Sequence, residues 1–193
     1  MKPKLNRLDN TGTMDRCQTP AYALAPVLPY LNFGWTIWEP ATGEGNLVKV
    51  MQSYNYNVVA TDILTGQDFF AHKFVRWDAI VTNPPFSLKY KFLARCYQLG
   101  RPFALLMPVE ILGAKQAQVL FEEFGTEVIF LRPRVNFKMP NKGLNGSGAQ
   151  FPVAWFTYGL GIGQQISFAK LKVHPDEQMA LSWSRPSPSP PLY

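Results

Sequence analysis

One short stretch of the chain combines glycines and carboxylates in a way that suits a nucleotide-like ligand. Residues 39–46 read Glu-Pro-Ala-Thr-Gly-Glu-Gly-Asn and follow an apolar run that we expect to be a strand. Gly43 and Gly45 permit close approach of the backbone, and free N–H groups at a helix start favour an anionic ligand group. An isolated Gly-x-Gly is equally compatible with a plain strand-to-helix turn.

Two aspartates follow at positions that suit recognition of a nucleoside. Asp62 comes directly after the next apolar run, about where a carboxylate that binds both hydroxyls of a ribose is expected. Asp68, followed by Phe69 and Phe70, suits a contact with an adenine amine beside an aromatic ring. The alternatives are that Asp62 caps a helix and that Asp68 caps a turn before core aromatics.

The most informative stretch is 78–86, an apolar run that ends in Asn83-Pro84-Pro85-Phe86. This stretch resembles motif IV of the amino-methyltransferases, enzymes that methylate exocyclic amines of nucleobases and, in one branch, glutamine side chains. Residues 39–46 are similar to their motif I. Gln18-Thr19-Pro20 is similar to the segment that covers the methionine end of their cofactor. The likeness extends over 18–158 and is greatest to the adenine-specific (N6) DNA methyltransferases of small phage or bacterial type.

The resemblance implies a reaction and a set of site residues. The catalytic residues would be Asn83, Pro84, Pro85 and Phe86. The Asn83 carboxamide oxygen and the Pro84 carbonyl would accept the two amine N–H groups and direct the nitrogen lone pair at a methyl group. Phe86 would stack on a base extruded from its helix. The cofactor implied is S-adenosylmethionine, contacted by Thr19, Pro20, Glu39, Pro40, Gly43, Gly45, Asn46, Asp62, Ile63, Asp68, Phe69 and Asn83.

A basic stretch at 132–150 is the expected contact with nucleic acid, since we find no separate target-recognition domain in the sequence. It carries four cations and no acid, namely Arg132, Arg134, Lys138 and Lys142. Phe137 lies among them, which adds a group that could stack on a base. The alternative is a solvated loop without a ligand.

The pattern of apolar runs predicts the elements that must position these residues. It predicts a mostly parallel, doubly wound sheet of the α/β class, Rossmann-like and seven-stranded, with an antiparallel terminal strand. Strands are expected at 35–39, 57–61, 77–82, 102–107, 128–131, 151–158 and 165–171, the last two forming an antiparallel edge, and any further strand around 68–70 must be very short. Helices are expected at 20–31, with Thr19 as N-cap, and at 45–54, 88–99 and 115–124.

Composition sets the remaining expectations. The 193 residues, 47% hydrophobic with a net charge of +6, suit one domain at 17–175, with a flexible arm at 1–16 and a Pro/Ser-rich tail at 176–193. Cys17 and Cys96 are too far apart in the sequence for a disulfide framework, and with two histidines the chain suits no metal site and a cytoplasmic setting. No stretch is apolar enough to cross a membrane.

The sequence therefore predicts an enzyme that methylates N6 of adenine in DNA, with nucleic acid as its partner and an oligomeric state that the sequence does not define. The first alternative is a methyltransferase acting on adenine or guanine in RNA, because Asn-Pro-Pro-Phe occurs in both groups. Methylation of a protein glutamine is disfavoured, because those relatives usually carry Tyr at the position of Phe86. A non-catalytic cofactor- or nucleic-acid-binding protein would not need the intact motif.

Overall fold

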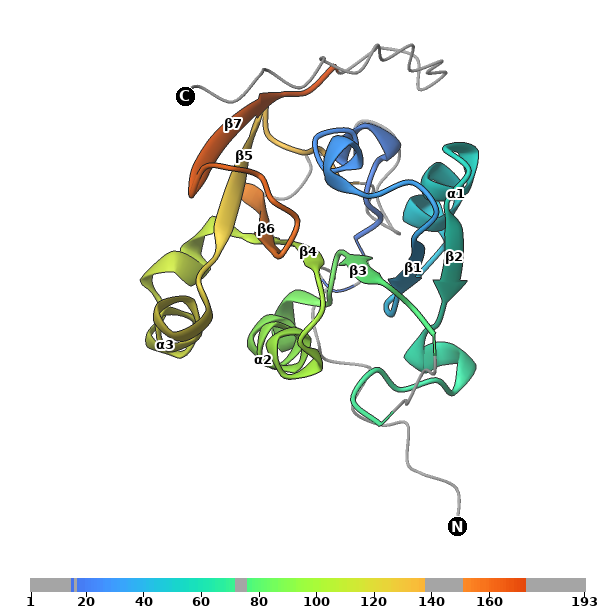
Figure 1. The fold of residues 1–193 in the computed structure, drawn as a ribbon, viewed down its shortest axis with the longest axis horizontal. Helices are drawn as coiled ribbons and strands as arrows, with labels where there is room; N and C mark the ends of the chain where they lie inside the picture. Colours follow the sequence, from blue (N-terminus) through green and yellow to red (C-terminus); the bar gives the residue numbers. More distant parts are fainter. Residues whose placement is uncertain (1–14, 16, 72–75, 138–150, 173–193) are drawn as a thin grey trace.

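The structure is a computed structural model and describes residues 15, 17–71, 76–137 and 151–172. A seven-stranded sheet runs through the molecule in the order β2-β1-β3-β4-β6-β5-β7 (Figure 1). Strand β6 is antiparallel to both of its neighbours, and all other pairs are parallel. The strands are β1 (Thr36–Glu39), β2 (Asn57–Ala60), β3 (Ala79–Thr82), β4 (Phe103–Pro108), β5 (Glu127–Arg132), β6 (Val153–Tyr158) and β7 (Ile166–Lys170).

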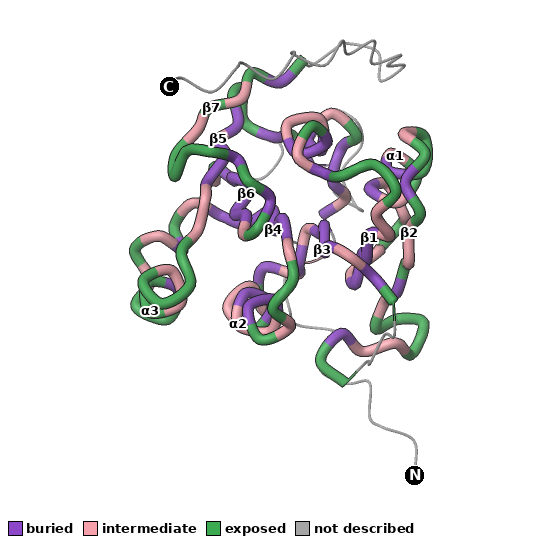
Figure 2. The backbone as a smooth tube through the Cα atoms, in the orientation of Figure 1, coloured by how far each residue is buried: buried purple, intermediate pink, exposed green. Residues whose placement is uncertain are grey.

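Helices cover both faces of the sheet and create two apolar cores (Figure 2). On one face, α1 (Asn46–Ser53) and the 3₁₀ helices η2 (Ala21–Ala23) and η3 (Leu28–Tyr30) pack against the sheet. On the other, α2 (Lys89–Leu99) and α3 (Lys115–Phe124) do so. Further 3₁₀ helices are η4 (Ile63–Thr65), η5 (Phe86–Leu88) and η6 (Val109–Gly113). The α/β class and the mostly parallel sheet are therefore confirmed.

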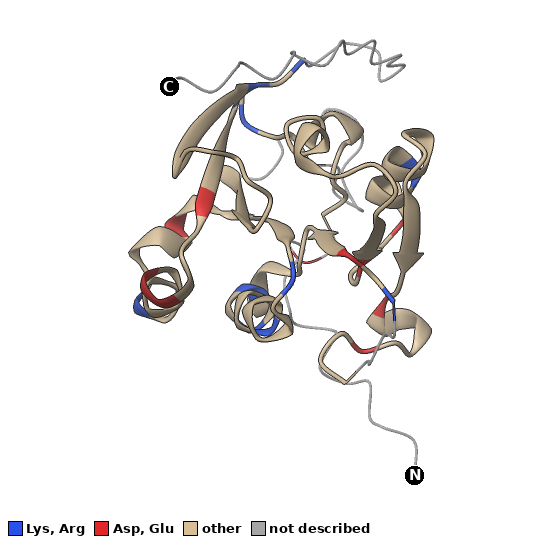
Figure 3. Ribbon diagram, viewed as in Figure 1, with Lys and Arg blue, Asp and Glu red and all other residues tan. Residues whose placement is uncertain are grey.

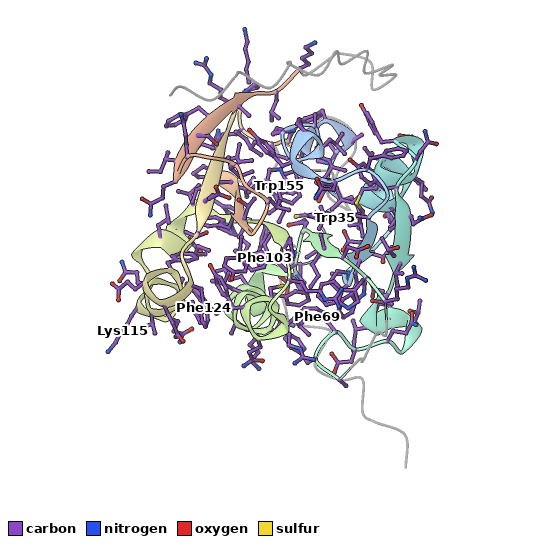
Figure 4. All side chains as sticks on the ribbon, viewed as in Figure 1. Trp35, Phe69, Phe103, Lys115, Phe124 and Trp155 are labelled. Carbon is purple, nitrogen blue, oxygen red and sulfur yellow. The ribbon has the colours of Figure 1, made fainter. Side chains whose placement is uncertain are left out.

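The first expected helix, 20–31, is not a regular α-helix. The chain forms η2 and η3 instead, and Pro20 has extended backbone angles at the N-cap of η2, where Thr19 was expected. Pro26 and Pro29 explain the difference, because proline has no N–H to donate and its ring clashes with the preceding turn of a helix. The segment is still held on the sheet, since Trp155 Nε1 donates to the Ala23 carbonyl over 2.7 Å (Figure 4).

The end of the sheet also differs from the expectation. The antiparallel strand β6 does not form an edge with β7; it lies between β4 and β5, and β7 pairs in parallel with the far side of β5. The turn at 159–165 therefore crosses over β5. Within the described residues, no helix is long and apolar enough to cross a membrane.

At 68–70, where any strand was expected to be very short, the part of the chain that the structure describes forms none, so β2 is an edge strand. The chain there forms η4 and a turn, and Phe69 packs into the core instead of extending the sheet. Its ring stacks on Phe92 at 4.6 Å and tilts against Trp38 at 5.1 Å, with 3% of the residue exposed (Figure 4). With so few residues between β2 and β3, one buried aromatic replaces a strand and its helix. The other expected helices and strands lie within two residues of their predicted bounds.

This packing predicts that Phe69→Ala lowers the free energy of unfolding by about 3–5 kcal/mol, because it leaves a cavity between Trp38 and Phe92. Phe69→Leu, which keeps most of the volume, should cost much less. Urea unfolding of both variants beside the parent measures the difference. A parental midpoint for Phe69→Ala would show that the ring is not part of the core.

Candidate active site

The sheet order places the candidate site where the chain reverses its direction of winding. From β1 the chain passes through α1 to β2 on one side, and β3 lies on the other side of β1. Ligands of open α/β sheets bind outside the carboxyl ends of the strands at such a point. Here β1 ends at Glu39 and β3 ends at Thr82, so the glycine turn and Asn83 leave neighbouring strands at the same edge.

A buried hydrogen bond joins these two strand ends. Thr82 Oγ1 donates to Glu39 Oε1 over 2.5 Å, and the Ala41 amide donates to the same oxygen over 3.0 Å. Both side chains are almost fully buried. Burial raises the pKa of Glu39 from an ordinary 4.5 to about 8, against the opposing effect of the two hydrogen bonds, and the charge of Asp62 raises it slightly further. Glu39 was predicted to contact the cofactor. In the structure its side chain accepts hydrogen bonds from Thr82 and from the Ala41 amide, and so helps to shape the turn.

The glycine turn is held by side chains from two other segments. Gly43 and Gly45 have φ of +54° and +78°, in the left-handed region that favours glycine. The Gly43 amide donates to Asp62 Oδ2 over 2.9 Å, and the Glu44 amide donates to Gln18 Oε1 over 3.2 Å. These two turn amides therefore already have acceptors, whereas the expectation of free N–H groups concerns the start of α1, which begins at Asn46.

Asp62 keeps capacity for a ligand despite its backbone contacts. It caps η4 by accepting from the Leu64 amide over 2.8 Å, and its other oxygen accepts from Gly43. A carboxylate has about four lone-pair positions, so each oxygen can accept one further bond. The half-buried side chain of Asp62 and the exposed Ile63 beside it therefore fit a ribose and a ring at the end of β2.

The second aspartate behaves as its alternative interpretation predicted. Asp68 Oδ1 accepts from the Phe70 amide over 2.9 Å, which caps the turn. The resemblance implied that Phe69 lies beside an adenine. In the structure Phe69 is a core residue at 3% exposure, so its side chain is not open to such a ring. The exposed aromatic of the pair is Phe70, at 37%.

The segment before η2 contacts both halves of the site. Gln18 lies on the glycine turn, and Asp15 accepts from the Ser87 amide over 3.0 Å and from Ser87 Oγ over 2.5 Å. Ser87 follows Phe86, so Asp15 and Gln18 contact the Asn-Pro-Pro-Phe loop and the glycine turn, respectively. Thr19 and Pro20 follow Gln18 and are buried. The sequence offered no signal for Asp15.

Asn83 carries a side-chain oxygen that is available to accept a hydrogen bond from a ligand. Its carboxamide oxygen is buried and has no hydrogen-bond partner among the described residues. Leaving such an acceptor unpaired costs about 1–3 kcal/mol, so a donor from a ligand would stabilise it. Pro84 is buried, and Pro85 has φ of −56°, which holds the loop extended after β3.

Phe86 is less accessible than its predicted role requires. It is 7% exposed and packs edge-on against Phe137 at 6.0 Å and Phe151 at 5.3 Å. A base can stack on Phe86 only where one of these rings moves aside. Lys89, missed from the sequence, supports the loop, because its Nζ donates to the Phe86 carbonyl over 3.3 Å and pairs with Glu110 at 3.5 Å. The sequence signal that could have indicated this role is the position of Lys89 at the start of the helix that follows the motif.

The basic stretch is only partly described. Arg132 and Arg134 are exposed at the end of β5, whereas Lys138 and Lys142 lie outside the described residues. Phe137 is 2% exposed and contacts Phe86, so it is not the solvent-facing stacking group that the sequence suggested. The part of the chain that the structure describes contains no group of three or more potential metal ligands, and its two cysteines, Cys17 and Cys96, are buried and form no disulfide.

Comparison with solved structures shows the class to which this fold belongs. The chain is similar to a type I restriction-modification system methyltransferase subunit from Streptococcus thermophilus, with a TM-score of 0.54 and 14% identity over 86% of this chain. It is also similar to a dimethyladenosine transferase from Plasmodium falciparum, with a TM-score of 0.45 and 12% identity over 73% of this chain. The likeness to the first establishes a methyltransferase fold.

The coverage of these proteins differs. The chain spans 50% of the S. thermophilus subunit and 62% of the P. falciparum enzyme. No protein-family model matches the sequence, and no curated protein matches it.

The raised pKa of Glu39 generates a prediction about stability. The folded protein keeps a proton that the unfolded chain has lost, so this contribution is fully present below pH 4.5 and disappears as the pH rises to about 8. The free energy of unfolding should fall across that range by up to about 1.4 kcal/mol per pH unit relative to Glu39→Gln, which does not titrate. Urea unfolding of both proteins from pH 5 to 8.5 tests this, and parallel curves would contradict the raised pKa.

Proposed function

We propose that this protein transfers the methyl group of S-adenosylmethionine to the exocyclic N6 amine of adenine in DNA. The observation that carries the proposal is the buried, unpartnered carboxamide oxygen of Asn83 beside the glycine turn. The methyltransferase fold supports it, since this fold implies S-adenosylmethionine as the methyl donor. When bound, this cofactor supplies an electrophilic methyl group on a sulfonium.

The described residues fit such a cofactor. Asp62 has free lone pairs for the ribose hydroxyls, and Gly43 lies so close to Gln18 that a Cβ there would be 3.1 Å from its Nε2. A larger residue at 43 would therefore push the Gln18 side chain away from the turn. We assign Thr19 and Pro20 to the methionine end of the cofactor. The backbone of Pro40, Gly45 and Asn46 would surround the cofactor at the glycine turn.

The chemistry at the amine is performed by the loop after β3. Asn83 Oδ1 and the Pro84 carbonyl accept the two N–H groups, so the nitrogen lone pair is no longer delocalised into the ring and can attack the methyl carbon. The C–S bond of the sulfonium would break as the N–C bond forms, so the sulfur would leave as a neutral thioether. No strong base is required, because the proton would pass to water only after the nitrogen has acquired the methyl group and a positive charge. Asp15 and Lys89 hold the loop from either side.

Incubation with labelled cofactor and separate DNA, RNA and protein pools, followed by digestion, tests the proposal. We expect label on N6-methyladenine in the DNA pool. Label in RNA alone would change the substrate to RNA, and label in protein alone would reject nucleic acid as the substrate.

Asn83→Ala should lower the methylation rate by roughly two to three orders of magnitude while cofactor affinity stays near that of the parent, because the variant lacks one preorganised acceptor. Asn57→Ala, an exposed asparagine on β2, is the matched control and should leave both unchanged. Single-turnover rates and calorimetric titration measure the two quantities. A parental rate in folded Asn83→Ala would remove Asn83 from catalysis.

Asp62→Ala should weaken cofactor binding by about 1.5–3 kcal/mol, the usual range for hydrogen bonds to a charged group. Because Asp62 also holds the amides of Gly43 and Leu64, Asp62→Asn separates the two effects: it keeps a side-chain oxygen that can accept from a backbone amide but loses the charge. We expect an intermediate loss by calorimetry. Unchanged affinity in folded Asp62→Ala would place the ribose elsewhere.

A further inference from the structure

Strand β7 forms one edge of the sheet and carries an exposed apolar face. Side chains alternate along a strand, so Ile166, Phe168 and Lys170 share a face. Ile166 is 54% exposed and Phe168 is 74% exposed. Exposed apolar residues on an edge strand invite association, and proteins seldom keep them without a use.

The Phe168 ring is supported from one side. It stacks on Phe130 of the neighbouring strand β5, with centroids 5.4 Å apart and planes at 24°. The register pairs these two residues directly. Phe130 itself packs against the core beneath α3, so Phe168 is a flat ring fixed against the sheet and open to solvent.

Cations gather at the same end of the two strands. The parallel register pairs Arg132 with Lys170, and the Leu171 amide donates to the Arg132 carbonyl over 2.7 Å, which keeps the strand ends together. Arg132, Arg134, Lys170 and Lys172 are all exposed, and blue segments mark this end of β5 and β7 in Figure 3. The described residues 130–137 and 168–172 include no acid.

We propose that the β7 surface, formed by Phe130, Arg132, Phe168, Lys170 and Lys172, binds a single-stranded segment of nucleic acid. An unpaired base stacks on Phe168, and the cations contact its flanking phosphates. Sites for single strands combine these two features, aromatic rings for bases and positive charge along the backbone. A second copy of this chain is a poorer occupant, because each copy carries a net charge of +6 and would repel the other.

The position of the β7 surface suits a substrate that also reaches the catalytic loop. The chain leaves β5 at Arg132 and reaches Phe137, which contacts Phe86. Five residues span at most about 18 Å, so Arg132 lies within that distance of Phe137. This inference rests on the proposed function only in taking nucleic acid as the ligand.

Replacing Phe168 tests the stacking contact. Fluorescence anisotropy of a labelled single-stranded oligonucleotide with the full chain should show that Phe168→Leu binds roughly 5- to 100-fold more weakly, since leucine keeps an apolar contact but has no ring. Phe168→Trp should bind like the parent. Phe33→Leu is the matched control, because Phe33 is also 74% exposed, and it should have no effect.

Replacing the lysines tests the phosphate contacts. The double variant Lys170→Gln/Lys172→Gln should flatten the slope of log affinity against log salt by about 0.7 for each phosphate that the variant no longer neutralises. Lys115→Gln, on α3, is the control and should leave the slope unchanged. A parental slope in the double variant would remove both lysines from the β7 surface.

The outcomes separate this inference from the proposed function. Parental binding by Phe168→Leu, in a protein that does bind the oligonucleotide, would overturn the β7 surface and leave the methylation proposal intact. A parent that sediments as a dimer and a Phe168→Leu variant that sediments as a monomer would overturn it in favour of an interface between copies. A parent that binds no nucleic acid and labels none would end both proposals.

Discussion

The hydrogen bond between Thr82 and Glu39 joins the two strand ends on which the candidate site depends. Placed at the carboxyl ends of β3 and β1, it links the strand that leads to Asn83 with the strand that leads to the glycine turn. Its energy depends on burial, because a carboxyl at 1% exposure loses its hydration and must be satisfied by protein groups. The Ala41 amide donates to the same Glu39 oxygen and so ties the start of the glycine turn to the buried carboxyl.

The direction of the strands then places the other groups of the candidate site at the same edge of the sheet. Parallel pairing of β2, β1, β3 and β4 brings Asp62, the glycine turn and the Asn-Pro-Pro-Phe loop to one edge of the sheet. The antiparallel strand β6 separates β4 from β5 without reversing β5, so the basic end of β5 faces that edge too. Topology alone therefore puts the candidate cofactor, amine and phosphate contacts along one rim.

The site is closed by contacts from distant parts of the sequence. Asp15 and Gln18 connect the loop after β3 to the glycine turn, and Phe137 and Phe151 cover Phe86. The Asn83 oxygen in the same loop is buried without a partner among the described residues, which makes an unpaired acceptor there costly and a donor ligand correspondingly favoured. The loop after β3 therefore carries both the packing contacts of Phe86 and the buried acceptor of Asn83.

By itself, the sequence determined the class of fold, the bounds of most helices and strands, and the edge at which the motifs meet. Those features follow from local patterns, since apolar periodicity and glycine or proline positions act over a few residues. Tertiary structure alone decided that Phe69 is a core residue, that Phe86 and Phe137 pack together, that β6 lies inside the sheet, and that Asp15 reaches Ser87. Each depends on segments far apart in the sequence, whose mutual burial no local pattern encodes.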